Sequence, residues 1–143
     1  MLTPMPARVV LTYGAFDLFH QGHVRLLHRL STMGTELIVG CSTDAYNAEM
    51  GVPSVMPYAQ RRLLLESCRF VDRVIAEQDH DQKYTDIVNY NVSVFAMGDD
   101  WTGQFDHLED VAQVVYIPRG RIIGAREPLN RVPQQMQRLA VGF

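Results

Sequence analysis

The apolar residues of this chain gather in five short runs, separated by more polar segments. Each run is rich in valine, isoleucine and other strand-forming residues, and it lacks the alternation of a strand with one face in water. Continuous apolar runs of this length are typical of strands in a sheet that is buried on both faces. The predicted strands are residues 8–13, 35–42, 71–77, 92–98 and 112–118.

Three of the intervening segments are predicted to be helices. In the first, Val24, Leu27 and Leu30 recur at helical spacing. In the second, Leu63, Leu64 and Ser67 are expected near one face. The predicted helices are residues 21–33, 58–70 and 81–91.

Strands that alternate with helices predict an α/β fold, built on a doubly wound, mostly parallel five-stranded sheet. In such sheets, ligands bind beyond the carboxyl ends of the strands, where the strand order reverses. Residues 14–23, 42–58 and 98–105 follow predicted strands. We therefore expect the functional site among these three segments.

Composition narrows the class of protein. A chain of 143 residues with 47% apolar and 20% charged residues suits one globular domain. The net charge of −3 does not favour a nucleic-acid partner, and no apolar run approaches the roughly 18 residues of a membrane span. The N-terminus lacks the pattern of a signal peptide, and Cys41 and Cys68 are interpreted as buried thiols. A cytoplasmic protein is expected.

The segment after the first predicted strand carries candidate phosphate chemistry. Gly14 and Gly22 let the backbone approach a ligand closely, and a helix that starts near Gln21 would direct its free N–H groups to the same place. His20 and His23 lie about one helical turn apart, so both rings can face that space. Two imidazoles there can donate hydrogen bonds to a phosphorus centre that gains charge during transfer.

Two other interpretations of these residues remain open at this stage. Histidines near a helix start are often solvated residues or polar caps. Alternatively, Asp17, His20 and His23 could form a metal site with two histidines and one carboxylate. Asp17 could also fix the tautomer of an imidazole or cap the helix.

The stretch "GAFDLFHQGH" (14–23) resembles the signature of the HxGH nucleotidyltransferases, in particular the cytidylyltransferase branch. Further segments resemble this branch in the same order, namely "STDAYN" (42–47), "YAQRRLLLESCRFVDRVI" (58–75), "VFAMGDDWTGQFD" (94–106) and "VVYIPR" (114–119). The last two look most like small bacterial members that act on glycerol 3-phosphate. The resemblance implies a single Rossmann-like nucleotidyltransferase domain over residues 1–143, with a divergent C-terminal tail at about 120–143.

The resemblance also implies a reaction and its participants. A cytidylyl group would pass from CTP to a phosphorylated alcohol, with glycerol 3-phosphate giving CDP-glycerol and pyrophosphate, with Mg²⁺ on the outer phosphates and in a homodimer. His20 and His23 would hold the α-phosphate in the transition state. The implied nucleotide-binding residues are Tyr13, Gly14, Ala15, Phe16, Gly22, Asp99 and Arg119, and those of the acceptor or phosphate region are Arg61, Arg62, Trp101 and Asp17.

Two departures from the family pattern leave alternatives open. The segment 119–130 keeps Arg119 but lacks the Ser and Thr hydroxyls that the family uses at the triphosphate. Residues 47–57 contain no lysine or arginine where the family has phosphate-binding lysines, and Lys83 is the only lysine in the chain. The alternatives are a non-catalytic nucleotide-binding protein, another acceptor phosphate, or the same chemistry with ATP.

Overall fold

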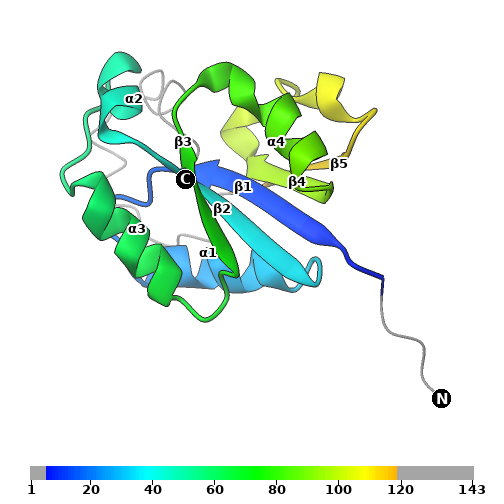
Figure 1. Cartoon of the computed structure of the whole chain (residues 1–143), viewed down its shortest axis with the longest axis horizontal. Helices are drawn as coiled ribbons and strands as arrows, with labels where there is room; N and C mark the ends of the chain where they lie inside the picture. Colours follow the sequence, from blue (N-terminus) through cyan, green and yellow to red (C-terminus); the bar gives the residue numbers. More distant parts are fainter. Residues whose placement is uncertain (1–5, 119–143) are drawn as a thin grey trace.

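The computed structural model describes residues 6–118 and is built on one five-stranded parallel sheet (Figure 1). All five predicted strands are confirmed, and their ends differ from the expected ones by at most two residues. In chain order the elements are β1 (Val9–Gly14), α1 (Gln21–Ser31), β2 (Glu36–Ser42), α2 (Asp44–Glu49), α3 (Tyr58–Ser67), β3 (Arg73–Glu77), η1 (His80–Gln82), α4 (Lys83–Asn89), β4 (Val92–Gly98), η2 (Asp99–Trp101), η3 (Asp106–Leu108) and β5 (Gln113–Ile117). Arg119 and the predicted tail lie outside the described residues.

The order of the strands across the sheet is β3-β2-β1-β4-β5. The chain builds outward from β1 to β3 and then returns to the other side of β1 for β4 and β5. The strand order therefore reverses between β1 and β4, whose carboxyl ends lie side by side. This confirms the predicted doubly wound α/β class and places the expected ligand edge at the segments that follow these two strands.

The sheet is covered on both faces, as its continuous apolar strands predicted. On one face, α1 and α3 pack against the sheet through a core that includes Leu26, Leu30 and Leu65. On the other face, α4 and the η2 and η3 turns pack through a second core that includes Ile87 and Phe105 (Figure 1). Within residues 6–118, no helix is both long enough and apolar enough to cross a membrane.

The helix predicted at residues 58–70 is present, but it ends earlier and buries other residues than expected. Leu63 and Leu64 are 61% and 37% exposed, while Arg61 and Leu65 are fully buried. The helix ends at Ser67. The buried stripe runs through positions four residues apart and begins at a charged residue, so hydrophobicity alone indicated the wrong face.

Two smaller expectations also changed. The short helix α2 was not predicted; Thr43 caps it by accepting the backbone N–H of Tyr46. Cys41 is buried as expected, whereas Cys68 is only half-buried.

Gly40 is required where β1 and β2 pair, opposite Tyr13. A Cβ atom at Gly40 would lie 2.3 Å from Cδ1 of the buried Tyr13 ring. We expect Gly40→Ala to lower the free energy of unfolding by about 1–3 kcal/mol, since the ring must move within a packed core. Urea titration measures the loss.

Candidate active site

His20 and His23 form a reciprocal cap at the start of α1. Nδ1 of His20 accepts the backbone N–H of Gly22 at 3.0 Å, and Nδ1 of His23 accepts the backbone N–H of His20 at 3.2 Å. The ring centroids are 4.1 Å apart. The structure thus brings the two predicted catalytic rings together beyond β1. The polar-cap interpretation is correct as well, because the same nitrogens cap the helix.

This cap defines the proton positions on the two rings. A neutral imidazole has one N–H and one acceptor nitrogen. Since both Nδ1 atoms accept backbone N–H groups, the neutral rings carry their protons on Nε2. Each ring is therefore set to act as a donor through Nε2. Donation to an anion is what transfer at a phosphate requires of these residues.

Aromatic neighbours hold the His23 ring. Phe19 stacks on it, and Phe16 packs at a tilt, each with a centroid separation of 5.4 Å. His23 is 7% exposed, whereas His20 is exposed at the sheet edge. The inner ring is therefore held in one orientation by packing.

The loop between β1 and α1 has an unusual backbone. Phe16 and Leu18 both have φ of +50°, in the left-handed region that residues with side chains seldom adopt. Such conformations cost about 1–3 kcal/mol each and persist only where the surroundings enforce them. The loop is therefore held in shape by contacts from outside it.

Asp17 supplies one of these contacts. Its carboxylate accepts the backbone N–H groups of Val55 and Met56, at 2.6 and 2.9 Å. The interpretation of Asp17 as a helix cap was wrong, because His20 caps α1 itself. Asp17 instead joins the loop after β1 to the segment that precedes α3.

We expect Asp17→Ala to lower the free energy of unfolding by about 1–3 kcal/mol, because two hydrogen bonds to a charged acceptor are lost. Amide hydrogen exchange at Val55 and Met56 should also become faster. Glu109→Ala, which removes an exposed carboxylate that makes no hydrogen bond or ion pair within residues 6–118, is the matched control. Unchanged exchange at both amides would contradict the assigned role.

Arg61 does not reach toward a ligand as expected, because acceptors within the fold occupy its guanidinium. Nη1 donates to the carbonyls of Ala15 and Ser42, at 2.9 and 2.7 Å. Nε donates to the carbonyl of Met56, and Nη2 pairs with Asp44 at 2.7 Å. Arg61 is thus a buried brace that joins three segments at the carboxyl edge.

Asp44, the ion-pair partner of Arg61, has a lowered pKa. The backbone N–H of Tyr58 and the Arg61 guanidinium hold the pKa of Asp44 below its usual range. Cys41 lies against the same guanidinium, with Nη1 3.5 Å from Sγ. Burial raises the pKa of the Cys41 thiol to about 11, so the thiol is protonated and does not act as a nucleophile.

Arg62 also departs from its expected role. Its guanidinium donates to the hydroxyl of Tyr58, to Glu66 and to the carbonyl of Val74. Val74 is near the start of β3, whereas the ligand edge lies at the other end of the strands. Arg62 therefore stabilises α3 against β3, and its contact with an acceptor or phosphate stays a prediction.

Tyr13, Gly14, Ala15 and Gly22 lie where the resemblance placed them, on β1, its loop and the first turn of α1. The Tyr13 side chain, however, is turned into the core, and its hydroxyl donates to Asp86 at 2.6 Å. Burial raises its pKa far above the usual range. Only the backbone of Tyr13 is available to a ligand.

Asp99 and Trp101 follow β4 and so reach the same edge of the sheet from the neighbouring strand. Asp99 is exposed in η2. Trp101 is 6% exposed and packs against Phe105 with ring centroids 5.5 Å apart. The indole therefore mainly packs against the core at this edge of the sheet. Asp99 is the exposed side chain of the two.

A buried ion pair joins Lys83 to Glu77, a pair that no motif of the sequence pointed to. Nζ of Lys83 lies 3.1 Å from Oε2 of Glu77, and both side chains are almost fully buried. Burial raises the pKa of Glu77, and the Lys83 ammonium opposes this shift. The one signal in the sequence is that Lys83, the only lysine, follows an acidic residue at the end of a predicted strand by six positions.

Metal ligation was the other interpretation of Asp17, His20 and His23. Both oxygens of Asp17 are occupied by backbone N–H groups. Across residues 6–118, no three His, Cys, Asp or Glu side chains converge as a metal site would require. The geometry thus gives this interpretation no support.

Comparisons with known proteins agree with the α/β fold and show the family. A family model described as Cytidylyltransferase-like matches residues 11–138. The glycerol-3-phosphate cytidylyltransferase of Bacillus subtilis (strain 168) is 48% identical over 110 residues, which cover 77% of this chain and 85% of the relative. The enzyme of that name from Staphylococcus aureus (strain NCTC 8325 / PS 47) is 47% identical over 110 residues, covering 77% and 83%.

A solved structure shows the same fold. It is the lipopolysaccharide core biosynthesis protein from Thermoplasma volcanium GSS1, with a TM-score of 0.67 and 21% identity over 78% of this chain and 97% of that one. The family match spans most of the chain and includes the histidine pair of α1. This chain therefore belongs to the Cytidylyltransferase-like family.

Proposed function

We propose that this protein transfers the cytidylyl group of CTP to glycerol 3-phosphate, which yields CDP-glycerol and pyrophosphate. The observation that carries the proposal is the histidine pair at the start of α1, whose Nδ1 atoms both accept backbone N–H groups, so that the neutral rings carry their protons on Nε2. Relatives that are 44–48% identical bear the name glycerol-3-phosphate cytidylyltransferase, which supports this donor and acceptor.

The reaction needs no nucleophile or general base from the protein. A phosphate oxygen of glycerol 3-phosphate is already anionic near neutral pH, because the second pKa of such a phosphate is about 6. This oxygen attacks the α-phosphorus of CTP. The bond from that phosphorus to the oxygen bridging the β-phosphate breaks, and pyrophosphate leaves with the bonding pair.

The residues at the start of α1 supply positioning and charge stabilisation. His20 and His23 donate through Nε2 to the α-phosphate oxygens as their charge grows. The positive end of the α1 dipole favours the same anion. Gly14 and Gly22 keep side-chain atoms out of the approach. When bound with CTP, Mg²⁺ would supply positive charge that offsets the charge of the leaving pyrophosphate.

The test is a pyrophosphate-release assay on the full chain with CTP, Mg²⁺ and glycerol 3-phosphate, with the product identified by mass spectrometry. Pyrophosphate and CDP-glycerol in equal amounts are expected, with ATP a much poorer donor. Equal rates with ATP would overturn the choice of base. No release with any phosphorylated alcohol would overturn the function.

A non-catalytic nucleotide-binding protein is the second candidate, and one observation favours it. Residues 47–57 carry no basic side chain, and Arg61, the nearest arginine after them, is committed to the fold. Calorimetry with CTP separates the candidates, because a non-catalytic protein would bind CTP and release no pyrophosphate.

We further propose that the protein acts in the cytoplasm as a homodimer, in keeping with its free cysteines and the exposed leucines of α3. Light scattering after size-exclusion chromatography tests the dimer. A mass of one chain at micromolar concentration would contradict it.

A further inference from the structure

The last residues of β1 have a sheet partner on one side only. β1 pairs with β2 up to its last residue, Gly14, whereas its pairing with β4 ends where Leu11 meets Phe95. This end of β1 lies at the point where the strand order reverses, and it leads directly into the loop before the histidine pair. With one ladder of backbone hydrogen bonds missing, its position depends on side-chain contacts.

Tyr13 makes these contacts on the face of the sheet that α4 covers. Its ring is fully buried and meets Phe95 edge-on, with ring centroids 5.8 Å apart. Its hydroxyl donates to Oδ2 of Asp86 at 2.6 Å, and because the pKa of Tyr13 is raised far above its usual range by burial, the hydroxyl keeps its proton and stays a donor. Gly14 has no side chain, so Tyr13 is the last residue of β1 that can be held in this way.

Asp86 is itself held by Gln82, one helical turn earlier. Nε2 of Gln82 donates to the same Oδ2 of Asp86 at 2.8 Å and to the carbonyl of Ala76 at 2.9 Å. Oε1 of Gln82 accepts the backbone N–H groups of Gln78 and Asp79. Both donors and both acceptor positions of this amide are therefore used. A continuous hydrogen-bonded network joins the end of β3 to the end of β1.

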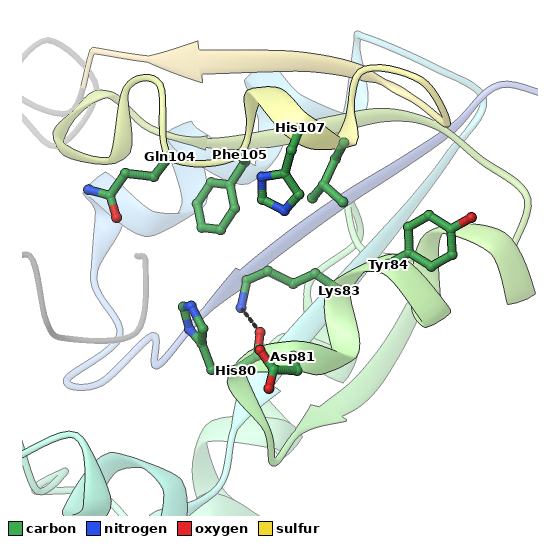
Figure 2. Close-up of a pocket in the computed structure, with 8 residues that line it drawn as sticks. His80, Asp81, Lys83, Tyr84, Gln104, Phe105 and His107 are labelled. Atoms are coloured by element: carbon green, nitrogen blue, oxygen red, sulfur yellow. Dashed lines mark hydrogen bonds between the residues drawn. The ribbon is translucent and has the colours of Figure 1, made fainter.

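The start of α4, on which Asp86 depends, is fixed as well. Lys83 extends from this helix start into the cavity between η1 and the chain around η3 (Figure 2). Its ammonium pairs with Glu77 and donates to the carbonyl of His80 at 3.4 Å. Nζ of Lys83 also lies 4.8 Å from the centroid of the Tyr13 ring. The helix that carries Asp86 is thus a firm support for Tyr13.

The same stretch of chain is held from the other face of the sheet. There, Nη1 of Arg61 on α3 donates to the carbonyl of Ala15 at 2.9 Å. Gly14 lies between the two contacts, with Tyr13 held by α4 and Ala15 held by α3. The backbone that opens the loop is therefore set by one hydrogen bond from each covering layer.

We infer that Asp86 is a positioning residue for the nucleotide: through the hydroxyl of Tyr13, it holds the end of β1 where the backbone of residues 13–16 meets the triphosphate of CTP. This role needs no contact between Asp86 and a substrate. The inference rests on the proposed function and deepens it.

Two single variants remove the contact from either side. Tyr13→Phe takes away the hydroxyl and keeps the ring, and Asp86→Ala takes away the acceptor. Because small displacements at a reacting centre are costly, we expect each variant to lower kcat/KM for CTP and to raise the Kd for CTP by about tenfold. The KM for glycerol 3-phosphate should change little. Asp86→Asn, which keeps an oxygen that can accept the same bonds, should restore both CTP parameters.

The double variant Tyr13→Phe/Asp86→Ala shows whether the two residues act through one bond. It should be no worse than the poorer single variant, because the bond between them is already lost in each. Losses that multiply in the double variant would overturn the inference. Unchanged CTP parameters in both single variants, or no recovery in Asp86→Asn, would overturn it too.

Ile87→Val is the matched control on the next residue of α4. Ile87 is 1% exposed, so the lost methyl group lowers the stability of the same helix while the bond between Tyr13 and Asp86 remains. Its CTP parameters should match those of the wild-type chain, measured by calorimetry and steady-state kinetics well below the unfolding transition of each variant. An equal change in Ile87→Val would show a merely structural effect. If Tyr13→Phe does not fold, Asp86→Ala and Asp86→Asn decide the inference, because Asp86 is only half-buried.

Failure of the inference differs from failure of the proposed function. If the wild-type chain releases pyrophosphate while Tyr13→Phe and Asp86→Ala bind CTP as tightly as it does, only the inference fails. If the wild-type chain binds CTP without transfer, the proposed function fails, and the Kd values for CTP alone decide the inference. A wild-type chain that does not bind CTP overturns both.

Discussion

His23→Ala is expected to lower kcat for cytidylyl transfer by about 10²–10³, since one donor to the charge that grows on the α-phosphate is lost. The ring of His23 is held by Phe16 and Phe19 and by its bond from the His20 backbone, so the donor is pre-positioned. Steady-state kinetics with saturating CTP and glycerol 3-phosphate measure the effect. The KM for CTP should change much less than kcat.

His20→Asn provides the control for folding. Asparagine is a good N-cap residue, so its side-chain oxygen can accept the Gly22 N–H in place of Nδ1. The helix start should then keep its stability while the Nε2 donor is lost, and a similar fall in kcat is expected. Full turnover in both variants would show that neither ring acts on the reacting phosphate.

Arg61→Leu is expected to lower the free energy of unfolding by about 3–5 kcal/mol, the largest stability effect predicted for this chain, because several acceptors lose one shared donor. The substitution leaves the carbonyls of Ala15, Ser42 and Met56 without that donor. Asp44 adds little to the loss, because its side chain is 54% exposed. Chemical denaturation followed by circular dichroism measures the loss. Most of the lost stability comes from the carbonyl groups that remain, because they lose their shared hydrogen-bond donor.

Arg62→Leu is the matched control on the next residue of the same helix. Arg62 is partly exposed and its ion pair with Glu66 is a surface pair, which is worth about 0–1 kcal/mol. The two arginines should therefore differ by several kcal/mol in their effect. A similar loss for both would contradict the role of Arg61 as a brace.

The sequence predicted the sheet and the histidine pair because both depend on local patterns. Continuous apolar runs indicate buried parallel strands wherever they lie in the chain. The spacing of His20 and His23 at a helix start placed the two rings together with no knowledge of distant residues. Their second role as a reciprocal cap required the actual geometry of Nδ1.

The roles of Arg61 and Lys83 could not be predicted in this way. An arginine near a helix start has the pattern of a surface charge, and Arg61 is buried only because three separate segments direct acceptors at it. Three consecutive leucines, Leu63 to Leu65, likewise cannot show which of them faces inward. Their face follows from the anchored position of Arg61 one turn earlier.

The bonds between the histidine rings and the helix backbone tie the aim of the donors to the integrity of the helix start. The Nδ1 atoms that accept the N–H groups of Gly22 and His20 also fix the direction in which each Nε2 points. A substitution that frays the first turn of α1 would therefore turn both rings as well, so helix content at this end and turnover should be lost together.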